Sequence, residues 1–391
     1  MFHVDLSPFG VDVDRLRTDR LTRLQGIMRA RDLSAMLLTD PLNIRYATNT
    51  VLWLNLRATG VQRFVLVPAD GEPVTYERLF GSERAAGLKK GGSIQGFGAY
   101  MFGMRPPVAT QDFVNLAVDG LKQMGVSGER VGVDALCLGA VDLLRESGFT
   151  VVDGLPALGE ARVVKTPDEV ELIRWTSRAK EGGYDLVREA VRKPPVVEER
   201  LSRMMLEYLL EQGFEAGSEF ISIFDSSQMA IRPHREPMGM DLVMTEGDLV
   251  ICDATVSGPG GYYSDFARTF CHGTPSQADK DRYAEAYATL QEALAYVRPG
   301  PCTELFARFG RDSTSRLPGL DGFHGVGMCI YEAPWLRGFD PPEYNLSLEE
   351  NMIIAFEINH HPVKLEHLLR VTADGAEILS TYPMEPELTP A

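Results

Sequence analysis

An acidic hairpin in the C-terminal half carries side chains that could bind metal. The apolar run 247–253 ends in Asp253, and Asp265 follows the glycine- and proline-rich cluster 258–261. If this cluster turns an antiparallel hairpin centred on Pro259, the two carboxylates lie almost opposite each other, about 5 Å apart at Cβ. Two carboxylates on apolar strands repel each other unless a cation lies between them.

The same arrangement recurs nearer the C-terminus. Residues 352–359 form an apolar strand that carries Glu357, the chain turns at 361–362, and residues 363–371 return with Glu366. Counting inward from the turn pairs the two glutamates. Opposed acids therefore occur in two separate hairpins, which favours a functional interpretation over coincidence.

A histidine completes this set of side chains. His324 lies in a segment with glycines at 325 and 327. Oxygen-rich ligands with one imidazole suit Mn, Fe, Co or Zn, and two ions roughly 3.5 to 4 Å apart can share carboxylates. The sequence predicts two divalent metal ions.

Composition limits the partners and the compartment. A chain of 391 residues favours two domains. The net charge of −16, without a basic stripe, argues against nucleic acid or an anionic membrane as a partner. Neither an 18-residue apolar run nor a signal-like N-terminus is present, so we expect a cytoplasmic protein. The five cysteines form no CxxC pair, and we expect reduced thiols.

The elements that position the acids change in character near residue 160. Before it, strand-like runs alternate with helical stretches, which is typical of an α/β domain. Thr166, Pro167 and Glu169 then match a capping box at the start of a long helix. We predict an α+β chain with domains at 1–160 and 161–391.

The ligand pattern as a whole resembles a known family. Five residues, in their order along the chain, look like the ligands of the pita-bread metallopeptidases, which include methionine aminopeptidase, aminopeptidase P and prolidase, with creatinase as a metal-free relative: Asp253, Asp265, His324, Glu357 and Glu366. The resemblance covers the whole chain. It implies an N-terminal creatinase-like α/β domain and a C-terminal pita-bread domain with a curved, mainly antiparallel sheet. It also implies a homodimer and a small-molecule or dipeptide substrate.

One branch of the family, the iron-dependent lyases acting on dimethylsulfoniopropionate, is similar through residues 40–48 and 324–327. The twelve-residue step between the first two ligands also resembles that branch. The lyase pattern has Asp, Tyr and Asp where this chain has Thr255, Gly319 and Ile330. The proton-handling groups proposed for the lyase are therefore missing.

The peptidase pattern differs in two places. It usually has a second histidine seven residues after the metal histidine, where this chain has Tyr331. The nine-residue step from Glu357 to Glu366 leaves no room for an excursion that carries a substrate-binding arginine in some prolyl peptidases. Both differences weaken the prediction of Xaa-Pro cleavage.

Further residues gain roles from the resemblance. His234 matches the histidine that peptidases use near the scissile group and that creatinase uses as its proton carrier. Arg232 and Arg235 could hold a substrate carboxylate by a bidentate contact. Trp53 could line the site of a partner subunit.

Together these residues favour a metal-dependent hydrolase of the Xaa-Pro peptidase type, acting on a C–N bond in a small amide, Xaa-Pro-like or amidine substrate. Glu357 would be the general base, while His234 and Tyr331 steady the tetrahedral intermediate. One alternative is a metal-dependent lyase that catalyses β-elimination on a sulfonium substrate. The others are a metal-free, creatinase-like enzyme and a non-catalytic binding protein.

Overall fold

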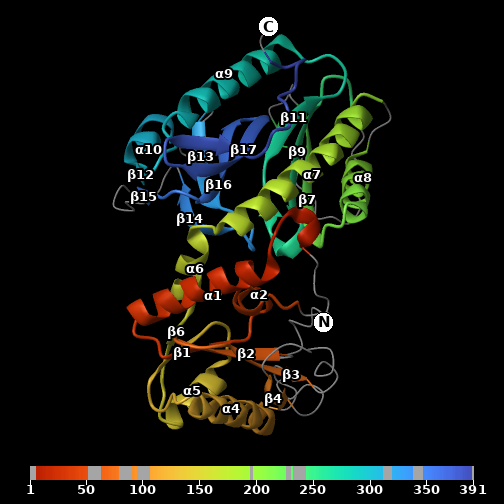
Figure 1. Ribbon diagram of the computed structural model, residues 1–391. Coiled ribbons are helices and arrows are strands. Elements are labelled where there is room, and N and C mark those ends of the chain that lie inside the picture. The colour runs from red at the N-terminus through yellow and green to blue at the C-terminus, as the bar shows by residue number, and fades with distance from the viewer. Residues whose placement is uncertain are drawn as a thin grey trace. The chain divides into compact units, whose positions relative to one another are not determined.

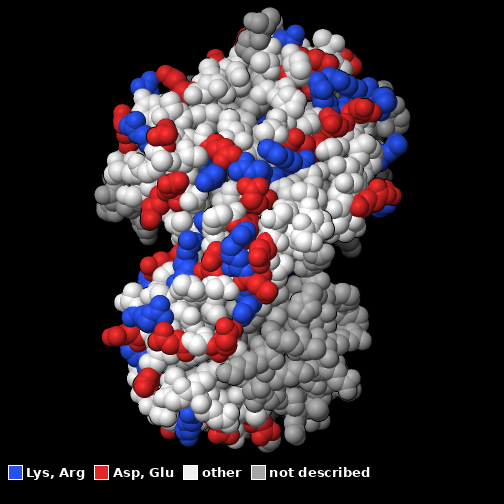
Figure 2. Space-filling model, viewed as in Figure 1, with Lys and Arg blue, Asp and Glu red and all other residues white. Residues whose placement is uncertain are grey.

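The computed structural model describes residues 6–51, 63–78, 90–94, 106–193, 197–225, 230–231, 244–310, 319–337 and 347–389. The chain divides into two compact units, residues 1–8 with 12–161 and residues 9–11 with 162–391 (Figure 1). No helix among these described residues is long and apolar enough to cross a membrane. On the face drawn in Figure 2, acidic and basic side chains are interspersed over the described part of the surface.

The N-terminal unit is built on a six-stranded mixed sheet with the order β4-β3-β2-β1-β5-β6. The strands are β1 (Ala35–Leu38), β2 (Arg63–Pro68), β3 (Val74–Arg78), β4 (Lys90–Ile94), β5 (Arg130–Val133) and β6 (Thr150–Asp153). The helices are α1 (Val13–Ala30), α2 (Pro41–Thr48), α4 (Pro106–Gln123), α5 (Leu138–Glu146) and α6 (Leu155–Val163), after a short 3-10 turn η1 (Ser7–Phe9). Figure 1 shows α1 and α2 on one face of this sheet and α4 and α5 on the other.

The C-terminal unit holds two larger antiparallel sheets. The first has the order β10-β9-β7-β8, with β11 also paired to β9, and the second has the order β14-β13-β16-β17-β18. The strands of the first sheet are β7 (Ala216–Asp225), β8 (Ala230–Ile231), β9 (Leu249–Ser257), β10 (Tyr263–Ser264) and β11 (Ala267–Cys271). Those of the second are β13 (Gly319–Gly325), β14 (Glu332–Arg337), β16 (Ile353–His360), β17 (Val363–Thr372) and β18 (Gly375–Ile378). A small pair, β12 (Gly300–Pro301) with β15 (Ser347–Leu348), stands apart.

Helices cover one side of each of these sheets. The long α7 (Pro167–Val191) and α8 (Glu198–Glu211) pack on β9 and β11, while α9 (Gln277–Leu294) and α10 (Thr303–Phe309) pack on the second sheet (Figure 1). The start of α7 is the predicted capping box: the Glu169 amide donates to the Thr166 hydroxyl and the Thr166 amide to the Glu169 carboxylate. Apolar residues buried under these helices fix the backs of both sheets.

The two sheets meet where β11 lies against β17. The Thr269 hydroxyl accepts from the Lys364 amide at 3.0 Å and donates to the Lys364 carbonyl at 2.8 Å. The buried Arg268 guanidinium donates to the Glu366 carbonyl at 2.7 Å and to the Tyr382 carbonyl at 2.6 Å. These side chains hold β17 by its backbone, so the acidic faces of the two hairpins are placed together.

Candidate metal centre

The five predicted ligands come from five places in the C-terminal unit. Asp253 lies on β9, Asp265 between β10 and β11, His324 on β13, Glu357 on β16 and Glu366 on β17. Ligand atoms of Asp265, His324 and Glu366 all lie within 4.8 Å of one another. Nε2 of His324 is 3.4 Å from Asp265 Oδ2 and 3.6 Å from Glu357 Oε1. The structure therefore gathers these side chains into one cluster.

The expected pairing of glutamates is confirmed. In the β16–β17 hairpin, Glu357 lies directly opposite Glu366, so both side chains leave the same face of the sheet. The turn between the two strands has only two residues, 361–362, which leaves little freedom for another register.

The expected pairing of aspartates is wrong by two residues. Asp253 faces Ala267 across the β9–β11 ladder, and Asp265 lies in the break between β10 and β11. The turn is centred on Gly260 instead of Pro259, because Gly260 and Gly261 adopt left-handed conformations with φ of 74° and 79°. A shift of two residues keeps Asp265 on the same face of the hairpin, where its carboxylate accepts from the Thr255 hydroxyl at 3.4 Å.

Burial sets the electrostatics of the cluster. Asp253, Asp265, His324 and Glu366 are buried, and Glu366 is fully inaccessible. Burial raises the pKa of Asp265 to about 8, and the Asp253 charge adds to the rise. The pKa of Glu366 is raised by burial and by Asp265, and burial lowers the pKa of His324. A cation bound beside these carboxylates would offset the cost of burying their ionised forms.

Unpaired oxygen atoms mark where such a cation could bind. Oδ1 of Asp253 and Oε1 of Glu366 are buried and have no hydrogen-bond partner among the described residues. Oε2 of Glu366 is 3.1 Å from the Lys364 ammonium but lacks hydrogen-bond geometry. Because unpartnered buried polar atoms are rare in folded proteins, these oxygens fit a metal-ligand role. The donor set of carboxylates and one imidazole suits a divalent transition metal.

Lys364, which the sequence analysis did not single out, lies inside this cluster. Its Nζ is 2.6 Å from Asp253 Oδ2, 3.1 Å from Glu357 Oε2 and 3.1 Å from Glu366 Oε2. Burial alone would lower the pKa of Lys364, but the surrounding carboxylates outweigh burial and raise it well above its ordinary value. Strand alternation was the available signal, since Lys364 stands two residues before Glu366 and shares its face.

A second buried lysine supports the aspartate hairpin from behind. Lys180 on α7 donates to the carbonyls of Ala254 at 2.5 Å and Ser264 at 3.1 Å, and its ammonium lies 4.0 Å from the centre of the Phe266 ring. Burial lowers the pKa of Lys180 to about 8, against the opposing effect of Asp265. Its place among the buried residues of α7, at helical spacing with Ile173 and Tyr184, was the missed signal.

Aromatic side chains border the cluster on one side. Tyr331 is 53% exposed and Trp335 is 45% exposed. The Tyr331 ring meets the His324 ring edge-on, with centroids 4.6 Å apart, and stacks on Trp335 at 5.0 Å. The loop before β14 is held by buried Glu332, which pairs with Lys165 at 3.0 Å and accepts from the Cys329 amide at 3.1 Å. Tyr331 is therefore presented from a fixed position.

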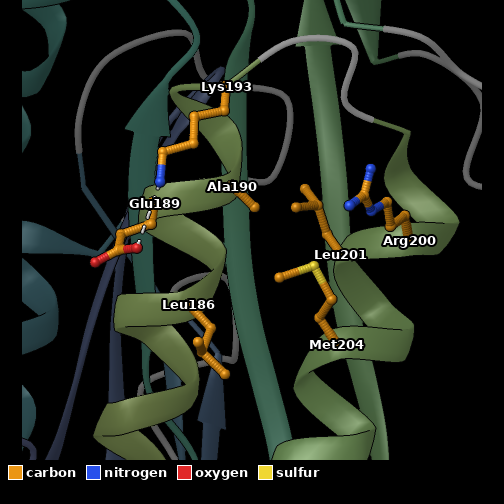
Figure 3. A pocket seen from close by; sticks show the side chains of 7 residues that line it. All are labelled: Leu186, Glu189, Ala190, Lys193, Arg200, Leu201 and Met204. Carbon is orange, nitrogen blue, oxygen red and sulfur yellow. Dashed lines mark ion pairs between the residues drawn. The ribbon is translucent and has the colours of Figure 1, made fainter.

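Four predicted site residues lie outside the described residues, and their roles stay predictions: Trp53, Arg232, His234 and Arg235. A separate hollow lies between α7 and α8 (Figure 3). Its lining consists of Leu186, Glu189, Ala190, Lys193, Arg200, Leu201 and Met204. Since it contains none of the predicted ligands, it is distinct from the metal cluster.

The chain is similar to known proteins over most of its length. Residues 171–373 match the model of metallopeptidase family M24, and residues 20–174 match the creatinase/prolidase N-terminal domain. The chain is 27% identical over 402 aligned residues to a dimethylsulfoniopropionate lyase of Roseovarius nubinhibens, covering 96% of this chain and 88% of the relative. It is 24% identical over 236 residues to a Pyrococcus furiosus Xaa-Pro dipeptidase, covering 58% of this chain and 65% of that protein.

Solved structures show the same fold. An Xaa-Pro dipeptidase from Bacillus anthracis matches with a TM-score of 0.71 at 20% identity, covering 94% of this chain and 99% of that one. Aminopeptidase P from E. coli matches with a TM-score of 0.67 at 17% identity, covering 95% and 96%. These matches confirm the predicted fold class, a creatinase-like N-terminal domain followed by a pita-bread domain. The chain belongs to metallopeptidase family M24.

Proposed function

We propose that this protein is a metal-dependent hydrolase that cleaves a C–N bond in a small, carboxylate-bearing amide, Xaa-Pro-like or amidine substrate. The cluster of Asp265, His324 and Glu366 carries the proposal, because its ligand atoms converge and a buried Glu366 oxygen there lacks a hydrogen-bond partner among the described residues. Mn, Fe, Co or Zn fits this donor set. A bound ion would supply Lewis acidity, which polarises a substrate carbonyl and makes a water molecule more acidic.

Glu357 is the carboxylate best placed to move a proton. Its side chain is 23% exposed, whereas that of Glu366 is inaccessible. Its Oε1 is 3.6 Å from the His324 ring nitrogen and its Oε2 is 3.1 Å from the Lys364 ammonium, so its carboxylate borders the cluster. In this proposal Glu357 takes a proton from the attacking water and passes it to the leaving nitrogen.

Tyr331 would donate a hydrogen bond to the oxyanion that forms on the substrate. Burial raises its pKa, and the charges of Asp265 and Glu357 add to this, so the phenol keeps its proton at neutral pH. A neutral phenol that donates to a developing negative charge stabilises the transition state. The proposal also gives His234 a place beside the scissile group, and it assigns the substrate carboxylate to Arg232 and Arg235.

β-Elimination on a sulfonium substrate is the second candidate, because the lyase relative matches nearly the whole chain. Against it, the lyase-type Asp and Tyr positions hold Thr255, Gly319 and Ile330. The Thr255 hydroxyl donates a hydrogen bond to Asp265. Because a hydroxyl does not ionise near neutral pH, Thr255 cannot replace a carboxylate. A metal-free enzyme or a binding protein is disfavoured by the unpaired buried oxygens.

One experiment separates the candidates. Metal-loaded protein is incubated with Xaa-Pro dipeptides, N-acyl amino acids and dimethylsulfoniopropionate, and products are separated by chromatography. A new free amine supports the hydrolase, whereas acrylate without a new amine supports the lyase. Glu357→Gln is expected to abolish amine release. Glu171→Gln, which changes a half-exposed glutamate on α7, is the matched control and should retain turnover.

A further inference from the structure

We infer that Tyr331 and Trp335 form an aromatic surface beside the candidate metal centre, and that this surface selects substrates with a planar aromatic group on the acyl side of the scissile bond. The inference rests on the proposed function for the reaction itself, and it names the class of substrate that the site prefers. It gives the ring of Tyr331 a part in binding besides the hydrogen bond of its hydroxyl.

Strand alternation turns both rings toward the same face of the second sheet. Tyr331, directly before β14, is exposed, as are Ala333 and Trp335, and the three residues that alternate with them up to Leu336 are buried. Because successive side chains of a strand point to opposite faces, the three exposed residues lie on one face. The helices α9 and α10 cover the other face of this sheet.

Strand register places Trp335 in line with the predicted metal ligands. Trp335 lies directly opposite His324 on β13, and His324 lies opposite Ala355 on β16. Ala355 stands two residues before Glu357. The side chains of Trp335, His324 and Glu357 therefore leave the same face of the sheet. Since β14 is the first strand in the order of this sheet, Trp335 lies at the edge of the face that carries the ligands.

The two rings form one surface next to the imidazole. The Tyr331 and Trp335 rings are stacked at an interplanar angle of 22°, and their centroids lie 4.6 and 6.4 Å from that of His324. They are the two aromatic residues among the exposed large hydrophobic side chains of the described part of the chain. Exposed aromatic side chains that gather at one place are typical of a binding surface.

Stacked rings favour a planar aromatic partner. A third ring can extend an offset stack or meet a ring edge-on, and both arrangements add to the gain from apolar burial. A saturated ring of similar size gains from burial alone. In the proposed reaction the Tyr331 hydroxyl bonds the substrate carbonyl oxygen, so the group attached to that carbonyl lies nearest to the two rings.

Two chelating probes test this without turnover. Benzohydroxamate and cyclohexanecarbohydroxamate carry the same chelating group, and one has a planar ring where the other has a saturated ring. Each is titrated calorimetrically into the Mn²⁺-loaded protein, and metal content is measured before and after. The readout is the ratio of the two affinities, because comparing this ratio between variants cancels any intrinsic difference between the chelators.

Substitution of Trp335 should change this ratio. Trp335→Leu removes the ring and should lower the preference for benzohydroxamate by about three- to tenfold, the range that aromatic contacts typically add. Trp335→Phe keeps a ring and should retain most of the preference. Leu210→Ala on α8, which also changes an exposed apolar side chain, is the matched control and should leave the ratio unchanged. An unchanged ratio in Trp335→Leu with wild-type metal content would overturn the inference. If that variant does not fold, Trp335→Thr, which suits an edge strand, is measured in its place.

Hydrolysis separates this inference from the proposed function. Wild-type protein is incubated with N-benzoyl and N-cyclohexanecarbonyl amino acids, and amine release is measured. We expect a higher kcat/KM for the benzoyl compounds. Amine from neither, with a probe ratio that still depends on Trp335, would overturn the proposed function but leave the aromatic surface standing. Amine from both at equal kcat/KM, with a ratio independent of Trp335, would overturn the inference alone.

Discussion

Charge compensation explains why single residues in this centre depend on one another. Burial disfavours the ionised forms of Asp265 and Glu366, and the same burial makes an unpaired ammonium unfavourable. Lys364 compensates part of the negative charge of the carboxylates. The oxygens of Asp253 and Glu366 that lack a hydrogen-bond partner among the described residues belong to the part that stays uncompensated. A metal ion bound there therefore serves both the stability of the cluster and its chemistry.

Tyr331→Phe tests the single residue that departs most clearly from the peptidase pattern. The change removes only the hydroxyl and keeps the ring that packs against His324. We expect kcat to fall by about 10²-fold with metal content unchanged, because loss of one oxyanion donor weakens transition-state binding. Steady-state kinetics on the substrate found above measures this. An unchanged kcat would remove Tyr331 from the mechanism.

The pairing of two strands could be predicted from the sequence where a short turn allowed only one register. The β16–β17 hairpin has Glu357 opposite Glu366, as expected. In the other hairpin, the centre of the turn is Gly260, one residue after the predicted Pro259, so the partner of Asp253 is two residues after the predicted one. The sequence of residues 258–261 does not show which glycine adopts a left-handed conformation. Lys364 escaped notice because a lysine on a strand usually reaches solvent. Only the meeting of β11 with β17 shows that it faces three acids.

Thr269→Val tests the contact between β11 and β17. Valine has a similar shape but leaves both the amide and the carbonyl of Lys364 without the hydroxyl they share. The free energy of unfolding should fall by about 1 to 3 kcal/mol, which is typical when buried polar groups lose their partners. Metal affinity should fall with it, because Glu366 lies two residues further along the same strand.

Urea unfolding and calorimetric titration with Mn²⁺ measure the two effects. Thr289→Val on α9 is the matched control, since that hydroxyl donates to the Glu285 carbonyl one turn earlier in a partly exposed helix. It should leave metal affinity unchanged. If Thr269→Val also leaves affinity unchanged, the β11–β17 contact does not position the ligands.

At the scale of the whole molecule, composition and element order gave the fold class, and the family resemblance gave its architecture. Each unit has its own buried core, one around Leu37, Phe64 and Leu66, the other around the two antiparallel sheets. Substrate specificity could not be predicted in the same way, because it depends on a few side chains around the cluster rather than on the fold. The homodimer stays a prediction, which light scattering of the purified protein tests. The place of Trp53 in the site of a partner subunit also stays a prediction.

Thiol reactivity offers a test of the described core. None of the five cysteines forms a disulfide in the structure. Burial raises the pKa of Cys302 to about 11 and of Cys271 to about 12, and it also raises the pKa of Cys252. These thiols stay protonated at pH 8, and protonated thiols react slowly. We expect rapid labelling of at most two thiols in the native protein and of five in urea. Rapid labelling of a third native thiol would contradict the burial of these side chains.

Metal removal should act on the C-terminal unit alone, because all five predicted ligands lie in residues 162–391. A ligand at about 100 times its Kd stabilises the state that binds it by about 2.7 kcal/mol. Scanning calorimetry with excess Mn²⁺ and then with chelator is therefore expected to show one transition that moves to lower temperature and one that does not. Asp265→Asn should abolish the difference between the two conditions. If chelator moves every transition equally in the wild type, the two units unfold together, whereas no movement at all would mean that the acids hold no ion.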